Sequence, residues 1–204
     1  MRKIVVSEFL TLDGVMESPE KWTFPFWTEQ IGKVKSDELF ESDALLLGRV
    51  TYELFAGAWP NLTDEDTWKM VKAAGGSFGE KPQTNSFADR MNSIQKYVVS
   101  TALQKVGWSN STLIKGDVVE EVRKLREQDG KDILISGSGE LVCSLMHHNL
   151  IDEFRLLVYP VVLGEGKRLF KEDAKATLKL VDAKQFSSGV VMLTYYGSHV
   201  EDEN

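Results

Sequence analysis

The sequence is poor in the residues that build disulfides and metal centres. Among its 204 residues there are one cysteine and three histidines. Cys143 therefore cannot form an internal disulfide or a cysteine-based zinc site, and we expect no bound metal. It follows Val142 on the apolar side of an expected helix, which favours a buried thiol over a nucleophile.

Long apolar runs and excess basic charge are absent as well. No run is long enough to span a bilayer, and the N-terminal residues lack the cleavage site of a signal peptide. Lysine and arginine number 24 against 31 aspartates and glutamates, which gives a net charge of −7. Nucleic acids and anionic membranes bind cationic surfaces, so we expect neither as a partner. We expect a cytoplasmic protein.

The length fits one domain, and no linker-like segment divides the chain. We therefore expect a single domain over residues 1–204. The residues Gly75, Gly76, Gly79 and Pro82 mark 61–92 as a variable insertion or loop, within which 64–74 is compatible with a helix. Residues 201–204 are expected to form an acidic tail.

Short apolar runs alternate with helical patterns along the chain. The β-branched and apolar runs predict strands at 3–9, 44–47, 95–100, 112–114, 132–136, 154–158, 178–186 and 190–196. Helical spacing predicts helices at 26–41, from 51, at 118–128 and after 139. The last two strands flank Ser187-Ser188-Gly189 and form an expected hairpin. The pattern predicts an α/β fold whose mixed sheet is mostly parallel, with an antiparallel C-terminal hairpin.

Two glycine turns each lead from an apolar strand into a helix. The first begins at Gly48-Arg49 and includes Thr51, and the second is Gly137-Ser138-Gly139-Glu140. Unpaired N–H groups and the positive end of the helix dipole favour an anion at such a turn, with phosphate as the leading candidate. Two phosphate sites on one chain suggest a dinucleotide. A lone Gly-x-Gly is also compatible with a tight turn that binds nothing.

In their order along the chain these motifs resemble a known family. Gly48-Arg49-x-Thr51-Tyr52-Glu53, Val99-Ser100-Thr101 and the segment 133–141 follow the order of the NADPH-binding elements of dihydrofolate reductase. The run 152–170 is similar to the C-terminal reductase domain of bifunctional riboflavin-biosynthesis deaminase-reductases. The resemblance covers nearly the whole chain except 61–92, and it implies a stand-alone reductase with the dihydrofolate-reductase-like three-layer fold.

The resemblance also implies roles for individual residues. Arg49 and Thr51 would contact the 2′-phosphate or adjacent ribose of NADPH, and Ser100 and Thr101 would line the adenosine side. The backbone of the second glycine turn would hold the pyrophosphate. The full cofactor-binding set is Gly48, Arg49, Thr51, Tyr52, Ser100, Thr101, Gly137, Ser138, Gly139, Glu140 and Leu141. On residue type alone, Arg49 could equally be a solvated surface arginine.

The implied reaction is hydride transfer from NADPH to a small planar heterocycle. A pterin or a pyrimidine fits, and reduction of 5-amino-6-(5-phosphoribosylamino)uracil is one such reaction. Dihydrofolate reductases place a carboxylate near the start of the first helix, but here Phe26 and Trp27 follow Pro25, and Glu29 is the first acid. The alternative is therefore a catalytically inactive NADPH-binding or nucleotide-binding protein on the same fold.

Candidate catalytic and substrate residues lie in the first loop and after it. Glu29 is either a proton donor or a glutamate stabilised by the helix dipole. Asp13 is either a group at the nicotinamide or a turn-forming aspartate. An aromatic wall for the substrate, or the loop's own small core, would be built by Trp22, Phe24 and Trp27.

The resemblance implies a homodimer, since the riboflavin-biosynthesis members pair through this domain. The apolar strands at 154–159 and 190–196 would supply the sheet edge that such pairing protects. The alternative is that both strands are interior and covered by helices.

Overall fold

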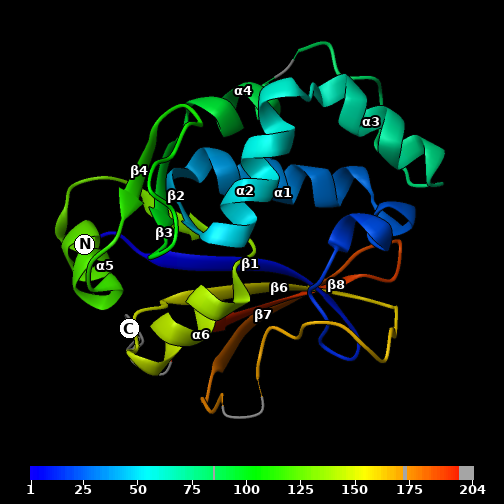
Figure 1. Ribbon diagram of the computed structural model, residues 1–204. Coiled ribbons are helices and arrows are strands. Elements are labelled where there is room, and N and C mark those ends of the chain that lie inside the picture. Colours follow the sequence, from blue (N-terminus) through cyan, green and yellow to red (C-terminus); the bar gives the residue numbers. More distant parts are fainter. Residues whose placement is uncertain (85, 172–173, 198–204) are drawn as a thin grey trace.

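The computed structural model describes residues 1–84, 86–171 and 174–197, so the expected tail at 201–204 lies outside the described residues. One mixed sheet runs through the middle of the molecule (Figure 1). Its strands are β1 (Ile4–Thr11), β2 (Ser42–Gly48), β3 (Gln95–Val99), β4 (Ser111–Ile114), β5 (Asp132–Ile135), β6 (Glu153–Tyr159), β7 (Lys179–Gln185) and β8 (Val191–Tyr196).

The strands pair in the order β4-β3-β2-β5-β1-β6-β8-β7. All neighbours from β4 to β6 are parallel, whereas β8 pairs antiparallel with both β6 and β7. In the central register, Val6 of β1 lies opposite Ile135 of β5 and Phe154 of β6. This topology confirms the mostly parallel sheet with an antiparallel C-terminal hairpin.

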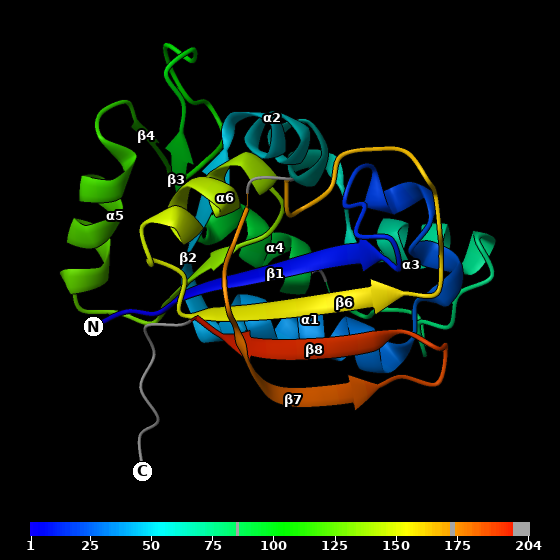
Figure 2. The same ribbon diagram turned by 90° about the horizontal axis from the view of Figure 1, so that it is seen from below.

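Helices cover both faces of the sheet and create three layers (Figures 1 and 2). On one side, here called the α1 face, lie α1 (Glu29–Glu41), α2 (Arg49–Ala58) and α4 (Ser86–Ser93), which contribute Leu39, Tyr52 and Met91 to a core with β2 and β3. On the other side, the α6 face, lie α5 (Val118–Glu127) and α6 (Gly139–His147). Because both sides of β1 are covered, nearly all of its residues are buried.

The first helix starts later than its apolar pattern predicted. Phe24–Phe26 form a 3-10 turn, and α1 begins at Glu29 because the Thr28 hydroxyl accepts a hydrogen bond from the Ile31 amide. This is the geometry of an N-cap, which fixes where a helix begins.

Residues 61–92, expected to be a variable insertion or loop, contain two helices. The helix compatible with 64–74 exists as α3 (Asp64–Ala73), and α4 was not expected. Ala88 and Met91 of α4 are buried, so tertiary packing stabilises a segment too short to form a helix alone. Cys143 is buried, and its thiol lies 3.2 Å from the Leu169 carbonyl, which confirms the buried thiol.

The two strands expected at the sheet edge are interior. β6 lies between β1 and β8, and β8 lies between β6 and β7. The edge strand at this end of the sheet is β7, every residue of which is exposed, and β4 forms the opposite edge. Among the described residues, no helix is long and apolar enough to cross a membrane.

Candidate functional site

The site forms where the parallel strands end. β2 and β5 are neighbours, yet α2 leaves β2 on the α1 face and α6 leaves β5 on the α6 face. A crevice between oppositely directed connections, at the carboxyl ends of parallel strands, is where open α/β sheets bind ligands. The first corner (residues 48–51) and the second corner (residues 137–140) both lie at this point.

Ser138 joins the two corners. Its hydroxyl accepts a hydrogen bond from the Gly48 amide at 2.8 Å and donates one to Thr51 Oγ1 at 2.8 Å. Its backbone has φ 74°, a left-handed conformation that a serine rarely adopts. The sequence prediction that both turns serve one site therefore agrees with their direct contact.

The helices at the site differ from the others in how they begin. Side chains cap α1, α3 and α5 through Thr28, Thr63 and Asp117. Neither α2 nor α6 has a side-chain cap: Gly48 has no side chain to offer, and the Ser138 hydroxyl is engaged with the first corner. First-turn amides of an uncapped helix need another acceptor, and an anion is a suitable one.

Close approach of the corners requires Gly137. Its φ is 78°, and a Cβ atom there would lie 2.9 Å from Thr51 Cγ2. Gly139 is less constrained, because a Cβ atom would meet only the flexible Met16 side chain, with its Sδ atom at 2.7 Å. Gly137 is thus the sterically demanding position of the pair.

Arg49 begins α2 beside the first corner. Its side chain is 45% exposed, and its guanidinium pairs with Glu53 at 2.7 Å. The side chain of Thr51 is buried and accepts the Ser138 hydrogen bond. Surface ion pairs contribute little free energy, so Arg49 can exchange Glu53 for a phosphate at small cost.

The side chains of several residues expected to bind the cofactor are engaged in contacts within the protein. Tyr52 is buried, and its hydroxyl accepts hydrogen bonds from the Gly107 and Trp108 amides. Leu141 is buried in the core, and the Ser100 hydroxyl accepts from the amides of the next turn. What these residues offer a ligand is their backbone.

Two other residues of that set are at the surface. Thr101, after β3, is exposed. Glu140 projects into solvent from the first turn of α6, where it pairs with Lys171. Its backbone amide still belongs to the uncapped turn.

Asp13 anchors the first loop to a later segment. One of its oxygens accepts a hydrogen bond from the Thr11 hydroxyl at 2.6 Å, and the other accepts from the Gly164 amide at 2.8 Å. These hydrogen bonds lower the pKa of Asp13 to about 2, and the bond from Thr11 has the largest effect. Asp13 is thus ionised at neutral pH and has no proton to give. Glu29 is exposed at the start of α1, beside Gly79.

The aromatic residues of the first loop pack around Tyr159 and Trp27. Trp22 meets Tyr159 edge-on at 5.4 Å and is buried, so it belongs to a small core. Phe24 lies against Trp27, which stacks on Phe78 at an interplanar angle of 1°. Tyr159 Oη and Trp27 Nε1 are buried without a hydrogen-bond partner, and burial raises the pKa of Tyr159.

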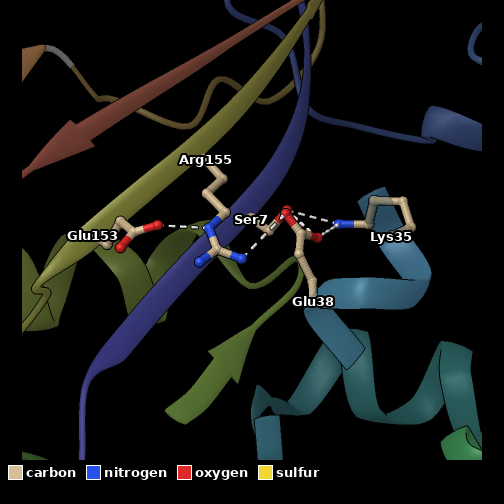
Figure 3. Close-up of polar contacts among 5 residues, drawn as sticks. All are labelled: Ser7, Lys35, Glu38, Glu153 and Arg155. Carbon is tan, nitrogen blue, oxygen red and sulfur yellow. Dashed lines mark hydrogen bonds and ion pairs between the residues drawn. The ribbon is translucent and has the colours of Figure 1, made fainter. Parts of the chain in front are cut away.

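A polar cluster between α1, β1 and β6 was not predicted from the sequence. Figure 3 shows Ser7 accepting a hydrogen bond from Lys35 Nζ at 2.7 Å, while its own hydroxyl lies 2.9 Å from Glu38 Oε2. Arg155 approaches Glu38 within 3.9 Å and bonds Glu153 at 2.6 Å. Glu38 is 2% exposed, so these contacts satisfy a carboxylate that is buried.

Glu8, the residue after Ser7, was missed as well. It is 4% exposed, and burial raises the pKa of its carboxyl to about 8, against the opposing effects of Lys35 and the Gly137 backbone. The signal was present in the sequence as a serine and a glutamate that interrupt an otherwise apolar strand.

Comparison with known proteins agrees with this geometry. The family model of the RibD C-terminal domain matches residues 2–192. The chain belongs to this family. A relative from Bacillus subtilis (strain 168), the uncharacterized protein YyaP, is 32% identical over 201 residues, which cover 96% of this chain and 95% of YyaP. Membership in the RibD C-terminal family supports a reductase-type function.

Solved structures confirm the fold. A pyrimidine reductase-like protein from Corynebacterium diphtheriae is 12% identical with a TM-score of 0.63, covering 98% of this chain and 93% of that one. A deaminase/reductase from Thermotoga maritima is 16% identical with a TM-score of 0.60, and the match covers 96% of this chain and 56% of that one. Dihydrofolate reductase from Enterococcus faecalis, complexed with NADP(H), is 14% identical with a TM-score of 0.56, covering 96% of both chains.

Proposed function

We propose that this protein is an NADPH-dependent reductase that transfers a hydride to a small planar heterocycle of the pterin or pyrimidine type. The observation that carries the proposal is the pair of helices without side-chain caps, α2 and α6, which begin on opposite faces of adjacent strands and are joined by Ser138. Two anion sites at this spacing suit a dinucleotide with a further phosphate.

The cofactor is assigned to the corners by their chemistry. The first-turn amides of α6 suit the pyrophosphate, since Gly137 lets the backbone come close and Ser138 leaves the turn uncapped. Arg49 suits the 2′-phosphate, because a guanidinium forms paired, charge-assisted hydrogen bonds to phosphate oxygens. Family membership and the likeness to an NADP(H)-complexed dihydrofolate reductase support this assignment.

The cofactor supplies the hydride when it is bound, and the protein's part is to bind, orient and exclude water. The half-buried rings of Phe24 and Trp27, near the first loop, suit a flat substrate, while Trp22 supports them from within the core. Asp13 holds the first loop in place through its hydrogen bond with the Gly164 amide. This bond therefore helps to fix the aromatic side chains that would lie beside the substrate. Glu29 at the start of α1 is the carboxylate proposed to pass a proton to the substrate.

Cofactor selectivity tests the proposal. NADPH and NADH are titrated by fluorescence against wild type, Arg49→Ala and Glu53→Gln. We expect a preference for NADPH of roughly tenfold or more, since a charged hydrogen bond is worth about 1.5–3 kcal/mol. Arg49→Ala should abolish that preference, whereas Glu53→Gln, which only frees Arg49 from its ion pair, should retain or strengthen it. Equal affinities in the wild type would refute the assignment.

A second candidate is a protein that binds NADPH without turnover. Phe26 and Trp27 follow Pro25, near the helix start where the resemblance to dihydrofolate reductase implies a carboxylate, and Asp13 is ionised. Both observations favour this alternative. Stoichiometric NADPH binding with no oxidation across a panel of pterins and pyrimidines would select it over the reductase.

A further inference from the structure

Glu8 lies beneath the second corner. On β1, Val6 and Leu10 belong to the core of the α6 face, and residues two apart along a strand share a face, so Glu8 lies on that face as well. The Gly137 backbone lies beside its carboxyl group and opposes the rise in its pKa. Glu8 therefore touches the turn assigned to the pyrophosphate.

The surroundings close this carboxyl off from water. Val15 bridges to Arg168, and Met16 lies against Gly139, so the first loop and the segment at 166–169 cover the start of α6. One carboxyl oxygen of Glu8, Oε1, is fully buried and has no hydrogen-bond partner among the residues that the structure describes. An orphaned buried oxygen is costly unless a ligand or water satisfies it.

Few charges act on Glu8. Lys35 and Glu38 of α1 lie on the opposite face of the sheet, where they bond Ser7 and each other. On the α6 side, Glu140 projects into solvent with Lys171. Because burial outweighs Lys35, the pKa of Glu8 is about 8, so the carboxyl is protonated at neutral pH and carries an O–H donor.

We propose that Glu8 makes dinucleotide binding proton-linked: its neutral carboxyl donates a hydrogen bond to a phosphate oxygen at the second corner, and its ionised form repels that phosphate. The inference rests on the proposed function and adds a residue to its cofactor site. Two independent observations support it, the uncapped N-terminus of α6 and the unpartnered, buried Glu8 oxygen beside Gly137.

The test is NADPH affinity between pH 6.5 and 9.5 in wild type, Glu8→Gln and Glu120→Gln. Wild type should lose roughly tenfold in affinity per pH unit above about pH 8, because only the protonated form binds well. Glu8→Gln keeps a neutral donor and an acceptor for Gly137, so its affinity should stay level. Glu120→Gln removes an exposed, lysine-paired carboxylate from α5, outside the two corners, and should retain the wild-type pH dependence.

Calorimetry of the wild type provides a readout that needs no variant. At pH 9.5, in two buffers of different ionisation enthalpy, binding should take up close to one proton per NADPH. The absence of proton uptake, or identical pH profiles in wild type and Glu8→Gln, would overturn the inference while leaving the proposed function intact. Failure of all three proteins to bind NADPH at any pH would overturn both.

Discussion

Two carboxyl groups near the same end of β1 have opposite pKa shifts. Glu8 is buried on the strand, and desolvation raises its pKa to about 8, whereas Asp13 in the following loop accepts hydrogen bonds from Thr11 and Gly164 that lower its pKa to about 2. Near neutral pH the first is an acid that holds its proton and the second an anion that anchors a loop. Their residue type alone does not distinguish these roles.

Glu8→Gln should change how stability depends on pH. Between about pH 4.5 and 8 the folded protein holds a proton on Glu8 that the unfolded chain releases, so the free energy of unfolding falls as pH rises through this window. Urea unfolding should show the variant more stable than wild type at pH 9 and little changed at pH 5. Parallel stability profiles for the two proteins would contradict the raised pKa.

Gly137→Ala should be more harmful than Gly139→Ala. The first places a methyl group 2.9 Å from Thr51 at φ 78°, which should cost about 1–3 kcal/mol in the free energy of unfolding and weaken NADPH binding. The second meets only the flexible Met16 thioether and should cost less. Urea unfolding and fluorescence titration measure both effects, and equal losses in the two variants would show that the contact with Thr51 is unimportant.

At the scale of elements, the strands and the glycine corners were predictable because their signals are local. Apolar runs that end at a glycine predicted β2, β5 and the helices that follow them. The short helix α4 was not predictable, because its stability comes from burying Met91 against distant strands. The burial of Glu8, and the use of the Tyr52 hydroxyl by the Gly107 amide, also depend on contacts between segments far apart in the sequence.

Ser138→Ala tests the contact between α2 and α6. It leaves the Gly48 amide without its acceptor and should lower the free energy of unfolding by about 1–2 kcal/mol. NADPH affinity should fall as well, because the corners lose their link. The matched control is Thr63→Ala, which removes the cap of α3 at a similar cost of about 1 kcal/mol.

The control should leave NADPH affinity unchanged, since α3 takes no part in the crevice. Urea unfolding and fluorescence titration of both variants separate stability from binding. Equal losses of NADPH affinity in the two variants would mean that Ser138 acts only through overall stability.

At the scale of the whole molecule, the exposed edge is β7. Leu180 is 51% exposed and Val181 46%, and β7 is the last strand of the sheet on this side. We propose that a homodimer forms through this edge, in place of the interior strands first expected. Light scattering at micromolar concentration should give about twice 23.0 kDa, and Val181→Lys should shift the mass toward the monomer. A wild-type monomer would refute the proposal.

A crystal structure of the NADPH complex tests the central claim most directly. We expect the pyrophosphate within hydrogen-bond distance of the first-turn amides of α6, at residues 139–141, and the 2′-phosphate on Arg49. The nicotinamide should then lie toward the first loop. A cofactor bound away from the two corners, with α2 and α6 still holding no phosphate, would contradict it.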